Sequence, residues 1–251
     1  MTTVSGPVLF GRFAFPPNSL GYCGPDDPAT MLATLTDESA PMEEVRHVVP
    51  AFQGAWPYLE LIGHGTGHDP LTYEVVEAYW LGSPLLERID LSTLGSSMEE
   101  RFRSRAGWNW SEVVEGINRG GRPNHAFHVF CIYPWVGLLQ SGIVEQPLAV
   151  LDRCRIRWGR VEGSVEGRLL VKSRPLIWER ARLRLGEEQV ESVRPPADGE
   201  VVSPGDLVAM HWDYVCQRVT PRQVARLRHY HDLHLSIVNG AGRRLAVRVE
   251  R

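Results

Sequence analysis

The sequence has little lysine, no excess of positive charge and no long apolar run. Lys172 is the only lysine beside 26 arginines, a compositional bias that points to no function. The formal net charge of −3 provides no positive field for a polyanion, which argues against a nucleic-acid-binding protein. The longest stretch without charge, residues 126–144, includes histidine, proline and glycine, so we interpret it as buried core and expect no membrane span.

Cysteines are also few, and they lie far apart. Cys23, Cys131, Cys154 and Cys216 form no C-x-x-C pair, which excludes a zinc knuckle and a redox motif of that type. Arg12 is the only basic residue of residues 1–20, so this segment does not resemble a signal peptide. We therefore expect a cytoplasmic protein whose cysteines are buried thiols.

The charge changes sign along the chain, which suggests two units. Residues 1–150 hold 8 arginines and 17 acidic residues, whereas residues 151–251 hold 18 arginines, Lys172 and 13 acidic residues. A boundary near Pro147–Asp152 coincides with a change from helical periodicity to strand-length segments. We therefore predict an α+β fold: a mainly helical unit of unknown role, residues 1–150, packed on a small β-barrel with a terminal helix, residues 151–251.

The expected elements follow from the spacing of apolar residues. Helical spacing predicts helices over residues 42–63 and 72–89, and shorter ones over 98–105 and 111–118. Pro50 and Pro57 must kink or split the first of these. Strands are predicted at Cys154–Val161, Arg168–Lys172, Arg180–Leu185, Val190–Val193 and Leu207–Trp212, followed by a helix from Thr220 to Asn239. Short strands at this density are typical of a small barrel.

A glycine-rich segment in the N-terminal unit carries metal-binding side chains. His64, His68 and Asp69 lie within seven residues that also include three glycines, in what we interpret as a flexible turn. No lysine follows the glycines, so a phosphate-binding loop is excluded. An ordinary loop between two helices is the favoured interpretation, and a metal site is the alternative.

A second pair of histidines, His125 and His128, lies at the start of the uncharged stretch. On a strand the two side chains would point to opposite faces, whereas on a helix they would lie on one side at a workable ligand spacing. A core histidine is favoured at each position. In the alternative, a metal- or cysteine-dependent enzyme of unknown reaction has its site at the junction of the two units, formed by His64, His68, Asp69, His125 and His128.

Histidines also gather in the predicted C-terminal helix. His229 and His231 would point to different sides of that helix, so only His231 and His234 could converge. Because His231 lies on the apolar stripe, we favour a packed helix over a metal site there.

Two short strings in the C-terminal unit carry a resemblance. Residues 154–161 read Cys-Arg-Ile-Arg-Trp-Gly-Arg-Val, and residues 205–211 read Gly-Asp-Leu-Val-Ala-Met-His, followed by a predicted helix. In order and spacing they resemble the HypC/HupF family of [NiFe]-hydrogenase maturation chaperones, small β-barrels with a C-terminal helix. By position, Cys154 matches the functional cysteine of that family and His211 its motif histidine. The N-terminal part resembles only uncharacterised actinobacterial proteins.

The resemblance implies an accessory protein, rather than an enzyme, that handles the iron unit or chaperones the large-subunit precursor. Cys154 and His211 would bind a transient iron unit, and the partners would be a HypD-like scaffold and the precursor. The chain departs from the family in that Cys154 is internal and Trp158 replaces a proline. We also expect the neighbouring arginines at 153, 155 and 157 to lower the pKa of Cys154 if they lie near its sulfur. In the alternative, Cys154 is a buried thiol and His211 a strand residue bonded to backbone.

Overall fold

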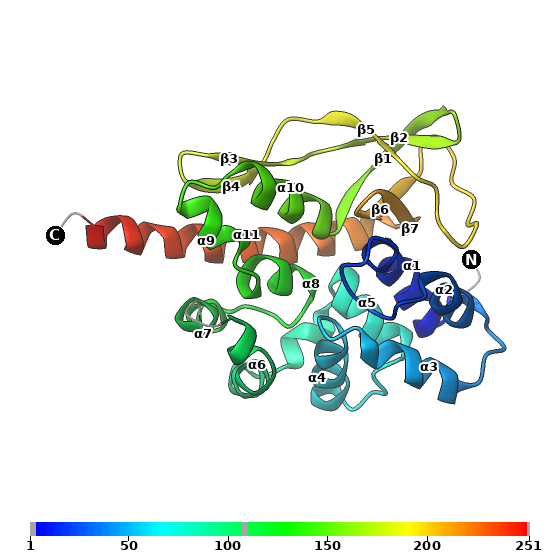
Figure 1. Cartoon of the computed structure of the whole chain (residues 1–251), viewed down its shortest axis with the longest axis horizontal. Helices are drawn as coiled ribbons and strands as arrows, with labels where there is room; N and C mark the ends of the chain where they lie inside the picture. The colour runs from blue at the N-terminus through cyan, green and yellow to red at the C-terminus, as the bar shows by residue number, and fades with distance from the viewer. Residues whose placement is uncertain (1–3, 107–109, 250–251) are drawn as a thin grey trace.

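Helices form the N-terminal part of the chain, and strands with one long helix form the rest (Figure 1). The computed structural model describes residues 4–106 and 110–249. The helices of the N-terminal part are α1 Gly6–Ser19, α2 Pro28–Thr36, α3 Met42–Val48, α4 Trp56–Thr66, α5 Tyr73–Leu81, α6 Leu91–Ala106, α7 Trp110–Asn118, α8 His125–Phe127, α9 Trp135–Gln140 and α10 Glu145–Cys154, with short helical turns η1 Val49–Ala51, η2 Pro84–Arg88 and the π-helix η4 His128–Ile132. The strands are β1 Arg157–Val165, β2 Arg168–Ser173, β3 Leu176–Glu179, β4 Arg182–Leu185, β5 Gln189–Val193, β6 Leu207–His211 and β7 Tyr214–Arg218, and α11 is Pro221–Val249. The predicted α+β class is confirmed.

Prolines and glycines set several helix limits. The predicted helix over 42–63 is split between α3 and α4, with Pro50 in η1 and Pro57 in the first turn of α4. The predicted helix over 72–89 ends early, because Gly82 terminates α5 with φ of +80°. A Cβ atom at Gly82 would lie 2.2 Å from Cδ2 of Tyr230, so this position also requires glycine for a close contact with α11.

The strands form an open sheet, so the predicted small barrel does not close. Five antiparallel strands are ordered β5-β2-β1-β6-β7, while β3 and β4 form a separate hairpin. Among the described residues, one bridge between Arg194 and Tyr214 joins the two edges of the sheet. Pro195 and Pro196 follow directly and lack N–H donors, so pairing does not continue and the sheet stays open.

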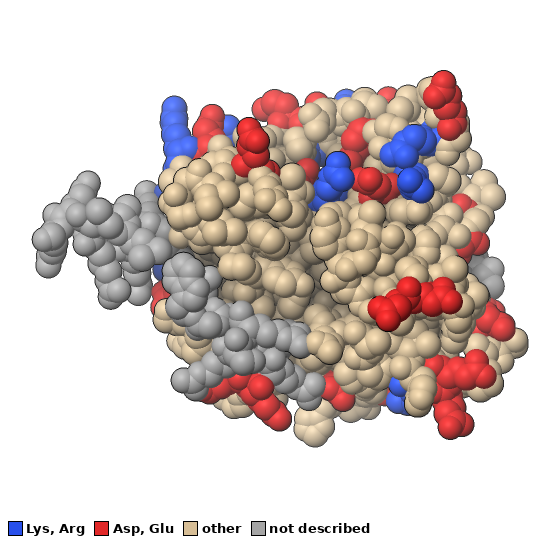
Figure 2. Space-filling view, in the orientation of Figure 1, with Lys and Arg blue, Asp and Glu red and all other residues tan. Residues whose placement is uncertain are grey.

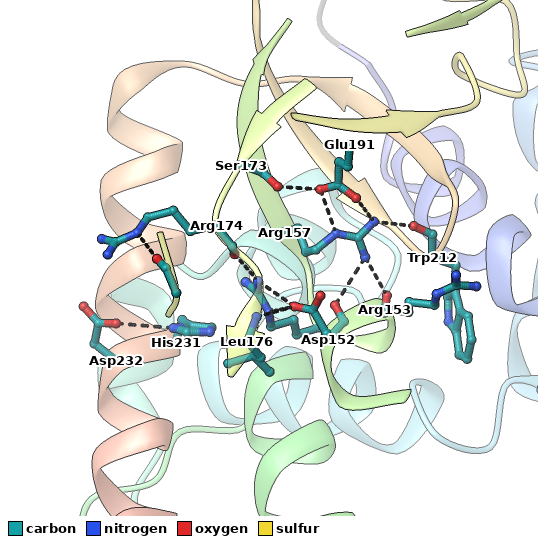
Figure 3. A network of polar contacts seen from close by, with 12 residues as sticks. Asp152, Arg153, Arg157, Ser173, Arg174, Leu176, Glu191, Trp212, His231 and Asp232 are labelled. Carbon is teal, nitrogen blue, oxygen red and sulfur yellow. Dashed lines mark hydrogen bonds and ion pairs between the residues drawn. The ribbon is translucent and has the colours of Figure 1, made fainter. Parts of the chain in front are cut away.

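The predicted boundary near Pro147–Asp152 falls inside α10. This helix runs from Glu145 to Cys154. Cys154 therefore ends a helix, and the prediction that it opens the first strand is wrong. Leu151 on α10 packs in one cluster with residues of β3, β4 and α11, so the apolar face of the helix lies against the strand part. Side chains from the end of α10 and from the sheet then share one network of polar contacts (Figure 3).

The helix α11 runs between the helical part and the β3–β4 hairpin (Figure 1), and it is longer than predicted. Gly240 does not end it. A Cβ atom there would lie 2.1 Å from Nη1 of Arg119, so the glycine makes room for the guanidinium of Arg119 instead of capping α11.

One core joins the two parts of the chain. The main cluster of buried apolar side chains extends from Phe10 and Phe13 of α1 to Ala209 of β6, Cys216 of β7 and Leu227 of α11. The uncharged stretch 126–144, predicted to be buried core, is buried only in part: 7 of its 19 residues are buried and 5 are exposed. Two of the buried residues, Val136 and Leu139, pack in one cluster with strand and α11 residues. Within residues 4–106 and 110–249, no helix has both the length and the apolar character that a membrane span requires.

Candidate metal centre

Three side chains of metal-binding type converge where the helical part meets the sheet. His125 begins α8, Cys154 ends α10 and His211 ends β6. One ring nitrogen of each histidine and Sγ of Cys154 all lie within 4.8 Å of one another. Ligand atoms of tetrahedral Zn²⁺ lie roughly 3.3–3.6 Å apart, because each is about 2.0–2.3 Å from the ion. Side-chain adjustments of about 1 Å would therefore bring these three atoms to ligand spacing.

His211 presents a lone pair that nothing uses. Its Nδ1 lies 2.7 Å from the backbone oxygen of Phe13, an acceptor, so Nδ1 carries the proton and Nε2 does not. Nε2 is buried and has no hydrogen-bond partner, while the whole residue is 1% exposed. Burial, followed by the nearby His125, holds the pKa of His211 well below its usual value, so the ring is neutral. A neutral imidazole fixed by a carbonyl on its far nitrogen is the usual state of a metal ligand.

His125 is held in the opposite tautomer. Its Nε2 donates to the backbone oxygen of Cys154 over 2.7 Å, which leaves the lone pair on Nδ1, 3.3 Å from the hydroxyl of Tyr79. Asn124 caps α8 by accepting from the Phe127 N–H and so fixes where this histidine starts the helix. Burial lowers the pKa of His125 to about 4, so it too is neutral.

Cys154 is protonated in the absence of a metal, against the expectation from its arginine neighbours. Burial, with a smaller contribution from nearby Cys23, raises the pKa of its thiol to about 12. The arginines do not activate the sulfur because each is paired elsewhere: Arg153 with Asp213, Arg155 with Asp152 and Arg157 with Glu191. A bound metal ion would displace the proton, since thiolate is the form that binds metals.

A buried arginine, Arg157, joins the backbone next to Cys154 to the backbone next to His211, and Figure 3 shows its contacts. The guanidinium of Arg157 donates to the backbone oxygens of Asp152 and Arg153, at the end of α10, over 3.2 and 3.3 Å. It also donates to the oxygen of Trp212 over 2.6 Å and pairs with Glu191. The N–H of Trp212 donates to the oxygen of Arg153 over 2.8 Å. The residues next to Cys154 and to His211 are therefore tied to each other directly.

The three side chains line a cavity of about 290 Å³. Aromatic side chains form much of its wall, among them Tyr79, Trp80 and Trp212. An adjoining pocket of about 390 Å³ shares part of this wall, namely Tyr22, Cys23, Gly54, His128 and Tyr133. Figure 2 shows a hollow in the middle of the face near α1 and α10, with lysine, arginine and acidic residues only toward its rim. The cavity is large enough for a small molecule beside the three ligand atoms.

Other residues of the predicted junction site lie outside the group of three. The prediction of a flexible turn at His64 is wrong: α4 continues to Thr66, so His64 lies on its last turn. The helix is capped by Gly67, which has a φ of +73°. His68 and Asp69 follow, and Asp69 pairs with Arg46. His64 and His68 line a different, open pocket.

His128 lies in η4 and lines the cavity, but it is not one of the three converging side chains. Its Nδ1 lies 3.1 Å from the hydroxyl of Tyr58. His231 and His234 are buried in α11, which agrees with the packed helix that the sequence favoured.

Sequence reasoning missed the aromatic wall and Cys23. Trp80 and Trp212 are 132 positions apart, and Tyr79 has no motif around it. Cys23, which lies far from Cys154 in the sequence, lines the same cavity, and burial raises the pKa of its thiol to about 11. No spacing signal links these residues, because only the packing of α1, α5 and the β6–β7 turn brings them together.

The family comparison covers both parts of the chain. The model of a family of unknown function, DUF6390, matches residues 2–245. No curated protein and no solved structure matches the chain. The resemblance to the HypC/HupF family is therefore wrong, as is the division of the chain between two families: one family spans helices and sheet, the sheet is open, and Cys154 ends a helix. The predicted role in hydrogenase maturation depended on that resemblance and loses its support.

Proposed function

Because the chain belongs to a family of unknown function, DUF6390, we propose its role from the site alone: a metal-dependent enzyme whose Zn²⁺ is held by His125, Cys154 and His211. The observation that carries the proposal is the convergence of three ligand atoms within 4.8 Å beside a cavity. Two neutral imidazoles and one thiol form a borderline-soft donor set that suits Zn²⁺.

The supporting structure around the ligands favours binding over chance proximity. The imidazole of His211 has the nitrogen away from its lone pair bonded to the backbone carbonyl of Phe13, which fixes its ring orientation and tautomer before a metal arrives. Both ring nitrogens of His125 have partners, Nε2 the oxygen of Cys154 and Nδ1 the hydroxyl of Tyr79, so a metal would displace one of these contacts. The buried, unpartnered Nε2 of His211 has no other use in the described part of the chain.

The number of ligands favours catalysis over a structural role. Structural zinc sites have four protein ligands, whereas catalytic sites have three and leave one position for water or substrate. Within the described residues the group has three members, and all three residues line the cavity. A bound Zn²⁺ would supply Lewis-acid polarisation of a carbonyl or a hydroxide nucleophile at neutral pH. The chain itself would place the ligands, exclude water through its aromatic wall and hold the substrate.

Metal content tests the proposal. The wild-type chain, after exposure to Zn²⁺ and removal of excess, should retain one Zn²⁺ per chain by elemental analysis. Cys154→Ala and His211→Ala should each lower the affinity at least tenfold, because each removes one of three ligands. With Co²⁺, the sulfur-to-metal absorption band should be present in the wild type and absent in Cys154→Ala.

Two control variants separate ligand loss from a general effect. Cys131→Ala removes a half-buried cysteine outside the group, and His64→Ala removes a histidine of the rejected cluster. Both should keep wild-type metal content. Equal metal content in Cys154→Ala and Cys131→Ala would overturn the proposal.

We retain the cytoplasm as the proposed compartment, which fits four cysteines that are free thiols.

A further inference from the structure

The charges of the proposed metal centre do not cancel. Zn²⁺ carries two positive charges, the thiolate of Cys154 supplies one negative charge, and the imidazoles of His125 and His211 bind metals in their neutral form. With the metal bound, the centre therefore keeps one net positive charge. Within the described residues, neither an Asp nor a Glu joins the group of ligand atoms that lie within 4.8 Å of one another. The missing negative charge has to come from the fourth ligand or from the surroundings.

The surroundings do not supply that charge. All the residues that line the cavity are described, and they include no Asp, Glu, Lys or Arg. Cys23 lines the cavity as a free thiol, but its sulfur is not in the group of three ligand atoms. Arg157 and Glu191 form an ion pair with each other, so together they add no net charge. An uncompensated charge away from bulk water is costly, so an anion is the favoured fourth ligand.

The wall of the cavity favours an anion with an apolar body. Aromatic and aliphatic side chains form most of this wall, including Phe52, Ala55, Trp135 and Val150. Contact with such side chains removes apolar ligand surface from water. A dry cavity of about 150 Å³ accepts benzene. The volume of about 290 Å³ therefore accommodates one ring that carries a small charged group.

We propose that the fourth position of the metal centre takes the carboxylate of a small monoanion with an apolar body, a substrate or product of the enzyme. One carboxylate brings the net charge of the centre to zero, and a carboxylate oxygen is an ordinary zinc ligand. A phosphate monoester carries up to about two negative charges at neutral pH and would leave a surplus. Hydroxide cancels the charge but leaves the apolar wall in contact with water. The inference rests on the proposed function, because the positive charge comes from the metal.

Four small probes test the charge and the apolar body. Benzoate is a monoanion with a ring; benzamide has the same shape without the charge; phenyl phosphate carries more negative charge on the ring; acetate keeps the carboxylate without the ring. On the Zn²⁺-treated wild-type chain, dissociation constants from calorimetry should be at least tenfold lower for benzoate than for benzamide and acetate, and at least threefold lower than for phenyl phosphate. Benzamide or phenyl phosphate binding as tightly as benzoate would overturn the charge argument, and equally tight acetate would overturn the apolar body.

Metal dependence shows whether the carboxylate reaches the metal. The chain treated with a chelator should lose its preference for benzoate over benzamide, since the positive charge leaves with the Zn²⁺. On the Co²⁺-treated chain, benzoate should change the visible absorption of the metal, whereas benzamide should not. An unchanged preference without metal, or an unchanged Co²⁺ spectrum at saturating benzoate, would place the anion elsewhere and overturn the inference.

A matched pair of variants tests the charge count from the side of the protein. Val150 lies four residues before Cys154 on α10, is half-buried and lines the cavity. Residues four apart share one face of a helix, so Val150→Asp places a carboxylate beside the centre. This variant should bind benzoate at least tenfold more weakly than Val150→Asn, which has the same shape without the charge. Equal benzoate binding by the two variants, each holding one Zn²⁺ by elemental analysis, would refute the charge count.

The metal centre and the ligand class fail in different ways. If the wild-type chain retains Zn²⁺ but does not prefer benzoate, the ligand class is wrong and the metal centre stands. If elemental analysis finds no retained Zn²⁺, the proposed function is wrong and the ligand class falls with it.

Discussion

Replacement of Arg157 by methionine tests how the fold positions the metal centre. The side chain of Arg157 is 4% exposed and makes contacts with the end of α10, with the β6–β7 turn and with β5 (Figure 3). Methionine keeps most of the apolar stem and removes every one of these donors. We expect the variant to fold with lower stability and with a disturbed distance between Cys154 and His211.

The magnitude follows from the groups left behind. The backbone oxygens of Asp152 and Trp212 lose the donor that Arg157 provides, at about 1–3 kcal/mol each for a buried unsatisfied acceptor. The oxygen of Arg153 still accepts from the Trp212 N–H, so removal of the Arg157 donor there costs little free energy of unfolding. Glu191 is 25% exposed and keeps its hydrogen bond from Ser173, so it is only partly deprived of partners when Arg157 is removed. The sum agrees with the roughly 3–5 kcal/mol expected for breaking a buried ion pair.

Urea unfolding measures the loss of stability, and Zn²⁺ titration measures the change at the site. The matched control is Arg184→Met, which removes an exposed arginine paired with Glu179 and should cost about 0–1 kcal/mol. Arg157→Met should also bind Zn²⁺ at least tenfold more weakly under conditions in which it remains folded. Equal unfolding midpoints for the two variants would refute the energetic argument, and wild-type metal affinity in Arg157→Met would refute the positioning argument.

Three further predictions concern metal linkage, pH and close packing. Zn²⁺ at about a hundred times its dissociation constant should stabilise the wild type by about 2.7 kcal/mol and raise its Tm by roughly 5–11 °C in calorimetry, with no rise in Cys154→Ala; equal rises would contradict the site. Burial lowers the pKa of His234 to about 3, so the unfolded chain takes up this proton first as the pH falls below about 6.5. His234 alone should then lower stability by up to about 1.4 kcal/mol per pH unit, in addition to the share of other buried histidines such as His125, and His234→Gln should reduce the slope by that amount between pH ~6 and ~4 in urea titrations; an unchanged slope would assign it to the other groups. Gly82→Ala should cost about 2–4 kcal/mol through strain and the clash with Tyr230, whereas Gly199→Ala, with a similar φ of +83° and open space around it, should cost about 1 kcal/mol; equal costs would show that the clash is relieved.

Secondary structure could be predicted from the sequence where its signal is local. Helical periodicity, with Pro50 and Pro57 as breaks, predicted α3 and α4 to within a few residues. Alternation and turn residues predicted β2, β5 and β6. These features depend on residues a few positions apart, so a single stretch of sequence contains the whole cause. Closure of the sheet depends on whether distant edges pair, and the barrel prediction failed for that reason.

The candidate site was only partly accessible to sequence reasoning. His125, Cys154 and His211 were each singled out, but in two separate hypotheses, and one of these rested on a resemblance that proved wrong. Their grouping needs α8, α10 and β6 to meet, which the Arg157 contacts and the shared core bring about.

The protonation of the site was decided by tertiary structure alone. The arginines beside Cys154 in the chain suggested a thiolate, whereas burial keeps the thiol protonated and the arginines pair with acidic residues from other elements. The desolvation of a side chain and the charges around it come from whatever packs against it. Those neighbours lie up to 198 positions away here, as Phe13 does from His211, and no local pattern encodes them.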